Sequence, residues 1–177
     1  VMQIDFSGHT PSIVGYGIGE FDPSSIKDGV IVEPGVVAAA AKELFERKLI
    51  GDITTRRVAM GIPSARTFDR SIKLPKLETK DIADAVRTEA EQYIPVPVDD
   101  LYLDYEIIRQ TPKEIDLFAT GVPKKIIDSY KTFVNLIGLD PVAMETSTQA
   151  ATRAFLRTDR SDVPTVLIDF GSLSTDI

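Results

Sequence analysis

The residue types best suited to chemistry lie near the end of the chain, in a polar turn that follows an apolar run. Val166–Ile168 is predicted to be a buried strand, and Asp169–Asp176 follows it directly with one glycine and several hydroxyl groups. Aspartate can hold a hydrated magnesium ion, and backbone amides beside a glycine can face a phosphate. The run is therefore a candidate phosphate site, although an ordinary hairpin with a capped turn has the same spacing.

Other polar residues are better explained as structure. The single histidine, His9, stands in a predicted turn, and the absence of cysteine excludes thiolate zinc sites, disulfides and cysteine nucleophiles. Two pairs of acidic residues could serve as paired carboxylates: Asp99 with Asp100, and Asp81 with Asp84. The first pair lies in a proline-flanked turn and the second on the exposed side of a predicted helix. We therefore expect both pairs to be solvated surface.

Composition narrows the class of protein. The 177 residues are 43% hydrophobic and 27% charged, a balance typical of a folded globular protein. The formal net charge of -7 argues against nucleic-acid binding, which needs clustered lysine and arginine. The longest apolar stretch, Val36–Ala41, is far shorter than the roughly 20 residues that cross a bilayer, so we expect a cytoplasmic protein. Because the chain starts at Val1 without an initiator methionine and stops at Ile177 just after a strand-like run, we expect both ends to be cuts in a longer protein.

Two groups of elements are predicted to position these residues. The first group is a hairpin of Val1–Phe6 and Ile13–Phe21, a helix that starts at Pro34 and is closed by Gly51, and a strand over Arg57–Pro63. The helix is predicted from apolar residues that recur at helical spacing, and the last strand from strict alternation of apolar residues.

The second group is predicted to be a compact α+β arrangement. Leu101–Ile107 alternates apolar and polar residues, which is the pattern of a half-buried strand. The expected elements, in order, are a strand over Phe68–Leu74, a helix over Glu78–Tyr93, antiparallel strands over Leu101–Ile107 and Ile115–Val122, a helix over Lys124–Ile137 ended by Gly138, and a strand over Pro141–Glu145. A further helix capped by Thr146 or Ser147 is expected to reach Arg157.

Several of these segments resemble, in the same order, signatures of the PilM family within the actin, Hsp70 and sugar-kinase superfamily. Ile168–Asp176 is similar to the second phosphate-binding hairpin of that superfamily, and Glu145 before an alanine-bearing helix is similar to its connecting motif. The segments similar to PilM are Phe68–Pro75, Glu89–Pro95, Leu103–Tyr105, Gly121–Tyr130 and Gly138–Glu145. The resemblance spans nearly the whole chain and is weakest before Asp28.

The resemblance implies an α/β fold in which a partial actin-like, ribonuclease H-like subdomain carries an inserted α+β module, as in FtsA and PilM. Residues 1–66 would form the first subdomain without its first strand, and residues 67–144 the inserted module. Residues 145–164 would be the return helix and linker of the first subdomain, and residues 165–177 would open a second lobe with the phosphate hairpin.

The resemblance also implies roles for the residues of this hairpin. ATP and Mg²⁺ would bind the full-length protein, whereas this fragment is expected to bind neither. Asp169 would hold magnesium through water, Gly171, Ser172 and Leu173 would offer backbone amides to phosphate, and Ser174 would offer a hydroxyl. Ser172 and Leu173 stand where smaller residues are common in the superfamily, which puts tight phosphate contact in doubt.

The remaining expectations concern Glu145 and a partner. Glu145 would orient water near the metal, with a solvated acid at a strand end as the alternative. The implied partner is the amino-terminal cytoplasmic tail of a PilN-like inner-membrane protein, with other pilus platform proteins or assembly ATPases as further candidates and no direct insertion into the membrane. Ile94, Leu103 and Tyr105 are candidate walls of a peptide groove, and a place in the module core is their alternative.

Two other functions remain open at this point. One is an FtsA-like cell-division anchor, which a carboxyl-terminal amphipathic helix would reveal. The other is an actin-superfamily ATPase or sugar kinase with real turnover, which would need a substrate base and a complete glycine-rich loop. We expect at most weak ATPase activity from the full-length protein and no enzymatic activity from the fragment.

Overall fold

The computed structural model describes residues 1–8, 10–158, 163–171 and 175–176. The chain divides into two compact units, and each is described by itself. The first unit comprises Val1–Ile62 and Asp128–Glu145, and the second comprises Pro63–Ile127 and Thr146–Ile177. One of the three boundaries between them, after Ile127, falls within helix α3 (Lys124–Leu136).

The first unit opens with the predicted hairpin. Strands β1 (Met2–Asp5) and β2 (Ser12–Tyr16) pair antiparallel, and β2 also pairs with the two-residue strand β5 (Ile50–Gly51). The second strand is shorter than the predicted Ile13–Phe21, because its backbone hydrogen bonds to the first strand go no further than Gly17, which bonds with Val1.

Helix α1 (Pro34–Arg47) follows, with Pro34 at its first position and Val37, Ala38 and Leu44 buried. The prediction that Gly51 closes this helix is wrong. Lys48 caps the helix, and Gly51 lies in β5 with a φ of 74°, a backbone conformation that glycine adopts without strain.

The remaining strands of the first unit are short or paired in twos. Strands β3 (Ile26–Lys27) and β4 (Val30–Ile31) form a small hairpin, and β6 (Arg57–Ile62) pairs with β10 (Asp140–Thr146). Gly138, at a φ of 70°, follows α3 as predicted. Its neighbour Leu139 donates a backbone hydrogen bond to Val134 O at 3.0 Å, which satisfies a carbonyl of the last helical turn.

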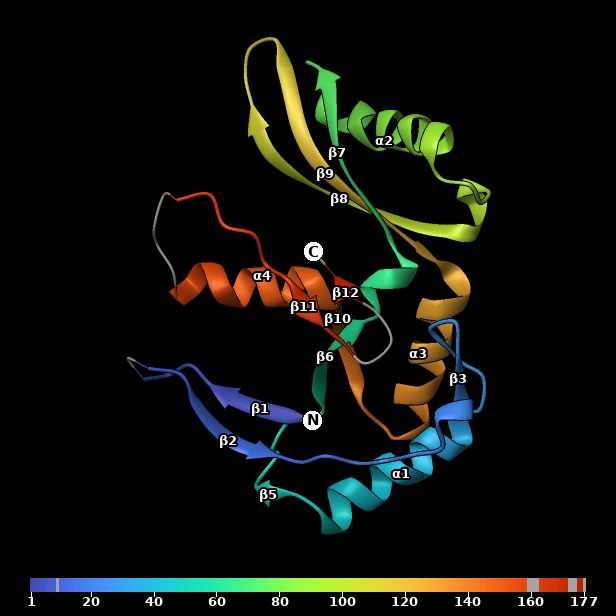
Figure 1. The fold of residues 1–177 in the computed structure, drawn as a ribbon, viewed down its shortest axis with the longest axis vertical. Coiled ribbons are helices and arrows are strands. Elements are labelled where there is room, and N and C mark those ends of the chain that lie inside the picture. Colours follow the sequence, from blue (N-terminus) through green and yellow to red (C-terminus); the bar gives the residue numbers. More distant parts are fainter. Residues whose placement is uncertain (9, 159–162, 172–174, 177) are drawn as a thin grey trace. The chain divides into compact units, whose positions relative to one another are not determined.

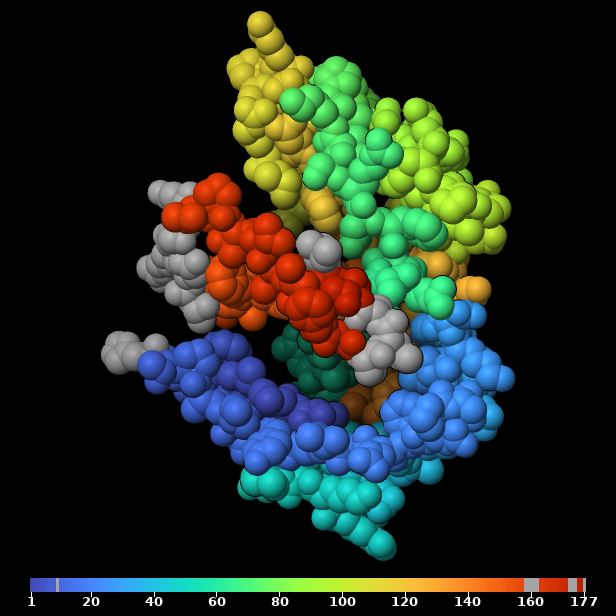
Figure 2. Space-filling model, viewed as in Figure 1, coloured from blue at the N-terminus to red at the C-terminus, as the bar shows by residue number. Residues whose placement is uncertain are grey.

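The second unit is built on a three-stranded antiparallel sheet of β7 (Phe68–Pro75), β8 (Leu101–Gln110) and β9 (Glu114–Pro123) in the order β7-β9-β8. Helix α2 (Thr79–Tyr93) packs along one face of this sheet, as Figure 1 shows. We call residues 68–123 the sheet module. Its strands and helix agree with the predicted elements, although the β8–β9 hairpin extends beyond Ile107 and forms the projecting end seen in Figure 2.

The core of the sheet module lies between α2 and the sheet. Alternate residues of β9 face the helix, and Ile115, Leu117 and Ala119 are at most 1% exposed. A second cluster continues the core toward the start of β8. Its buried members are Ala90, Ile94, Val98 and Leu101. Period-two alternation on the strands and helical spacing on α2 thus bury one continuous apolar surface.

Helix α4 (Ser147–Thr158) starts as the sequence predicts. The Thr146 hydroxyl accepts a hydrogen bond from Gln149 N at 3.2 Å, and the Ser64 hydroxyl accepts one from Thr148 N at 2.9 Å. Three single turns of three-ten helix also occur within the described residues. They are η1 (Pro23–Ser25), η2 (Ser64–Arg66) and η3 (Val98–Asp100).

The predicted buried strand over Val166–Ile168 is not formed. Val166 and Ile168 are 73% and 46% exposed, and the regular pairing begins only at β11 (Asp169–Phe170), opposite β12 (Thr175–Asp176). An apolar run becomes a buried strand only where neighbouring strands flank it. Within the described residues, β11 pairs with β12 alone.

Candidate functional site

The predicted phosphate turn lies at the β11–β12 hairpin. Asp169 pairs with Asp176 and Phe170 with Thr175, so the turn that joins the strands contains Gly171. Asp169 and Gly171 are exposed. Ser172, Leu173 and Ser174 lie outside the described residues, and the roles predicted for them stay predictions.

The donor chemistry of this hairpin fits a hydrated magnesium ion better than a directly held metal. Within the described residues, no three histidine, cysteine, aspartate or glutamate side chains are placed to hold a metal together. Asp169 offers one exposed carboxylate, and Mg²⁺ is often bound by one or two carboxylates, several waters and substrate phosphates. Glu145 is half-buried near the end of β10, in the first unit, whereas Asp169 belongs to the second. Their shared role near magnesium stays a prediction.

Two of the three predicted groove residues come together in the sheet module. A Cβ atom added to Gly121 would lie 3.1 Å from Ile94 Cδ1 and 3.2 Å from Leu103 Cδ2. The glycine therefore makes room for both side chains. Ile94 is 6% exposed and belongs to the second core cluster, whereas Leu103 is half-buried against it.

Tyr105, the third predicted groove residue, is half-buried against the other core cluster, which contains Ile72 and Leu117. Ile94, at 6% exposed, has little surface left for a ligand. Leu103 and Tyr105 lie on β8 and remain partly accessible.

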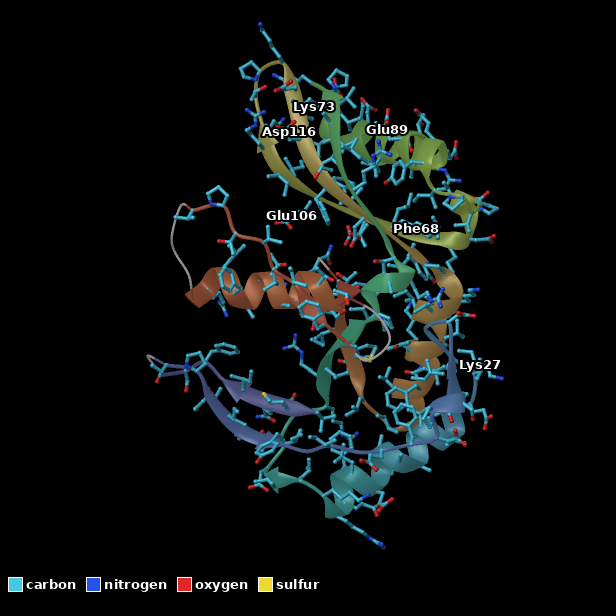
Figure 3. All side chains as sticks on the ribbon, in the orientation of Figure 1. Lys27, Phe68, Lys73, Glu89, Glu106 and Asp116 are labelled. Atoms are coloured by element: carbon cyan, nitrogen blue, oxygen red, sulfur yellow. The ribbon has the colours of Figure 1, made fainter. Side chains whose placement is uncertain are left out.

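The opposite face of the same sheet carries charges whose arrangement sequence reasoning missed. The strand register aligns Asp69 with Thr120 and Asp104 in one row, and Ser71 with Phe118 and Glu106 in the next. In Figure 3, Glu106 points away from α2. The alternation of acidic with apolar residues along β8 was the available signal, but only the register shows what lies beside each carboxylate.

The distal row of this face is an ion-pair cluster. Arg109 contacts Asp116 at 2.6 Å and Glu114 at 3.1 Å, and Lys73 lies 3.8 Å from the Asp116 carboxylate. Figure 3 places Lys73 and Asp116 together near the hairpin end. The pKa of Arg109 is raised, mainly by its hydrogen bond to Asp116. Charges in this row are therefore already neutralised within the module.

The acidic pair Asp99 and Asp100 lies on the surface, as predicted. Arg87 on α2 donates a hydrogen bond to Asp99 Oδ1 at 2.7 Å, and this bond lowers the pKa of the carboxyl group. Asp99 remains 86% exposed. Its ion pair with Arg87 therefore joins η3 to α2 at the surface, and the two aspartates do not form an enclosed acid site. Among the described residues, no helix is long and apolar enough to cross a membrane.

One protein family matches most of the chain. Residues 12–172 match the sequence profile of the family described as type IV pilus assembly protein PilM. The solved PilM-PilN type IV pilus biogenesis complex contains a chain with a TM-score of 0.77 and 22% sequence identity, over 89% of the present chain. The present chain covers 46% of that chain, which is less than half of its length.

The cytoplasmic domain of EpsL, an inner-membrane component of the type II secretion system of Vibrio cholerae, has a TM-score of 0.46 and 14% identity. That match covers 60% of the present chain and 42% of the EpsL chain. The likeness to the solved pilus complex confirms the predicted fold class, a partial actin-like subdomain with an inserted α+β module.

Proposed function

The chain belongs to the type IV pilus assembly protein PilM family, and from that membership we propose that it is an actin-like adaptor for the cytoplasmic tail of a PilN-like membrane protein. The family match over residues 12–172 carries the proposal. The fold likeness to a chain solved in a complex with PilN supports it. The adaptor acts at the cytoplasmic face of the inner membrane, where its partner holds it.

The sheet module is the part of the chain best suited to this task. It has its own buried core, so it can present a fixed surface to a peptide. Half-buried Leu103 and Tyr105 offer apolar contacts on β8. A short tail that lies in extended form along a sheet gains main-chain hydrogen bonds and side-chain contacts together.

The test is a calorimetric titration of the full-length protein with a synthetic peptide of the partner's amino-terminal cytoplasmic segment. We expect saturable binding with one peptide per protein. A scrambled peptide of the same composition is the control. The absence of heat up to about 1 mM peptide would remove the adaptor function, because the affinity would then be too weak to hold a complex.

We further propose that the full-length protein binds ATP with Mg²⁺, and that Asp169 and the Gly171 amide contribute to this site. Magnesium would supply positive charge that offsets the phosphates. Asp169 would orient the hydrated ion, and Gly171 would let the backbone approach a phosphate. Equilibrium binding of a fluorescent ATP analogue to the full-length protein and to Asp169→Ala tests this, with loss of affinity expected in the variant. Equal affinity would exclude the role of Asp169.

Release of phosphate from ATP decides whether the protein is also an enzyme. We expect slow release or none, because an adaptor needs only the bound state of the nucleotide to bias its partner binding. Sustained turnover that depends on a small-molecule acceptor would instead favour a kinase.

A further inference from the structure

Strand β7 forms one edge of the sheet module, and its outer side carries no neighbouring strand. The order β7-β9-β8 pairs β7 with β9 alone among the described strands. This pairing is regular over eight residues, from Phe68 opposite Gly121 to Pro75 opposite Glu114. A regular strand with one unpaired side can accept a further strand through its backbone N–H and C=O groups.

The two faces of β7 differ, because side chains alternate along a strand. Ile72 and Leu74 belong to the core that α2 covers and are 6% and 4% exposed. Asp69, Ser71 and Lys73 lie on the opposite face and are exposed. The edge therefore carries a row in which a negative, a neutral and a positive side chain follow one another at alternate positions.

The positive end of this row, Lys73, is loosely held within the module. Its Nζ atom lies 3.8 Å from the Asp116 carboxylate and 3.9 Å from that of Glu114, both beyond hydrogen-bond distance, and its side chain is 64% exposed. Arg109 contacts both carboxylates more closely, at 2.6 Å and 3.1 Å. Lys73 can therefore engage a further carboxylate without losing a short ion pair.

The negative end, Asp69, is available in the same way. Its carboxylate accepts a hydrogen bond from the Thr67 hydroxyl at 3.5 Å, which is long for such a bond. Within the described part of the chain, Asp69 has no ion-pair partner. The adjacent Arg70 lies over the Tyr93 ring, at 4.5 Å from its centre. Each end of the row can thus accept a charge from outside the module.

The row is complementary to a second copy of itself. A two-fold axis perpendicular to the sheet places two β7 strands antiparallel and keeps each side chain on its own face. With the axis at Ser71, Asp69 of each copy lies opposite Lys73 of the other, so two ion pairs form. Phe68 and Leu74 meet in the same way on the face that carries α2.

The neighbouring registers lack this match. Because only side chains of the same face can meet, the alternatives move the axis along the strand by one residue. An axis at Arg70 brings two arginines together, and an axis at Ile72 leaves Asp69 opposite Pro75. Opposite charges stabilise directly opposed positions of a strand pair, and like charges destabilise them. The sequence therefore favours the register centred on Ser71.

We propose that the protein associates with a second copy of itself through antiparallel pairing of its β7 strands, centred on Ser71, with ion pairs between Asp69 and Lys73. The two three-stranded sheets then form one sheet that is continuous across the contact. The contact uses one strand from each copy, so its area is small, and we expect a dissociation constant on the order of 100 µM. This association goes beyond the adaptor function and does not require the partner tail.

The first experiment measures the oligomeric state of the full-length protein by sedimentation equilibrium, from about 5 to about 500 µM, where wild type should show a monomer–dimer equilibrium. Asp69→Lys places two positive charges opposite each other and should weaken the dimer at least about tenfold. The matched control is Glu106→Lys, which makes the same charge change on the same face at the other edge of the sheet (Figure 3) and should leave the dimer within about twofold.

A mixing experiment separates contact from misfolding. Lys73→Asp alone should also be monomeric, because it places two negative charges opposite each other. An equimolar mixture of Asp69→Lys and Lys73→Asp should associate to within about threefold of the wild-type affinity, because opposite charges then meet at both positions. Variants that had merely lost their fold would stay apart, and thermal unfolding of each is measured in parallel.

The second experiment tests the register. Ser71→Cys places a thiol at the two-fold axis, where directly opposed Cβ atoms lie about 5 Å apart. The 177 residues contain no cysteine, and any cysteine elsewhere in the full-length protein is first replaced by serine. A short thiol crosslinker should then join two copies, whereas Glu106→Cys, at the far edge of the sheet, should give at most about one tenth of that yield.

The outcomes decide this proposal separately from the adaptor function. Wild type that stays monomeric up to about 1 mM overturns the proposal. Equal association of wild type and Asp69→Lys, or a mixture of the two charge variants that stays monomeric, overturns it as well. Equal crosslinking through Ser71→Cys and Glu106→Cys would place the contact on another surface. In each case the adaptor function stands, because the titration with the tail peptide measures it independently.

Discussion

The sheet module and the carboxyl-terminal segment of residues 163–176 differ in how their apolar side chains are used. In the sheet module, Ile82, Val86 and Leu117 are each 1% exposed. In the carboxyl-terminal segment, Val166 and Phe170 are 73% and 79% exposed. The module thus fixes its own geometry through burial, whereas the apolar side chains Val166 and Phe170 remain exposed in this chain.

This difference separates the two parts of the proposed function. The proposed surface for the partner tail lies on β8, whose register against β9 is set over nine residue pairs from Leu101 to Gln110. The candidate nucleotide residues Asp169 and Gly171 lie on an exposed two-residue pairing. A peptide that binds the folded module should raise its stability, so peptide binding can be tested by unfolding measurements. Nucleotide binding, in contrast, needs further surfaces that hold the hairpin in place.

The largest expected effect comes from truncating one large apolar side chain in each region. Ile115→Ala should lower the free energy of unfolding by about 3 kcal/mol, because Ile115 is 0% exposed and its removal leaves a cavity. Phe170→Ala should cost less than about 0.5 kcal/mol, because Phe170 is 79% exposed. Urea unfolding followed by circular dichroism measures both. Equal losses would show that the two regions are packed alike.

The elements of the sheet module could be predicted because their local pattern and their burial agree. Alternation along Leu101–Ile107 and helical spacing along Glu78–Tyr93 identify the faces that pack together. The predicted strands end short of the hairpin end, because Arg109 and Glu114, which lie beyond the predicted bounds, form a charge pair and continue no apolar alternation. The exposed edge of β8 was also missed, because sheet order depends on contacts between distant segments.

The carboxyl-terminal segment shows the opposite case. Val166–Ile168 has the composition of a buried strand, yet burial depends on neighbouring strands that a local window does not contain. Ile94 illustrates the same limit from inside the module. Its position after α2 suits a groove wall as well as a core residue. Only the structure shows that the side chains of Ile94 and Leu103 both pack closely over Gly121.

A smaller effect is expected where the module has little free space. Gly121→Ala should destabilise the protein by about 1 kcal/mol, because the new Cβ would lie 3.1 Å from Ile94 and 3.2 Å from Leu103, closer than unstrained packing allows. The matched control is Gly61→Ala in β6, where no atom lies within 4 Å of the new Cβ. That variant should be neutral or slightly stabilising. Chemical denaturation distinguishes them, and a stabilised Gly121→Ala would mean that the module is loosely packed there.

A still smaller effect is expected at the distal end of the same sheet. Arg109→Ala removes the contacts to Asp116 and Glu114, whose charges then repel. All three side chains are at least partly exposed, so the urea midpoint should fall only slightly, and the difference should shrink in about 1 M NaCl, which screens surface charges. A large loss that persists in salt would instead place the hairpin end within the folding core of the module.

The smallest effect is expected from alkali, and it again separates the module from the carboxyl-terminal segment, which has no tyrosine. Burial raises the pKa of Tyr93, which packs against both core clusters, although Arg70 at 4.5 Å from the ring centre opposes the shift. A raised pKa means that the folded state favours the neutral phenol. The resulting stability is complete below the unfolded value of about 10 and is lost as the pH rises through the folded pKa. Urea midpoints measured from about pH 8 to pH 11 should therefore decline more steeply in wild type than in Tyr93→Phe, and identical slopes would show that the ring is solvated.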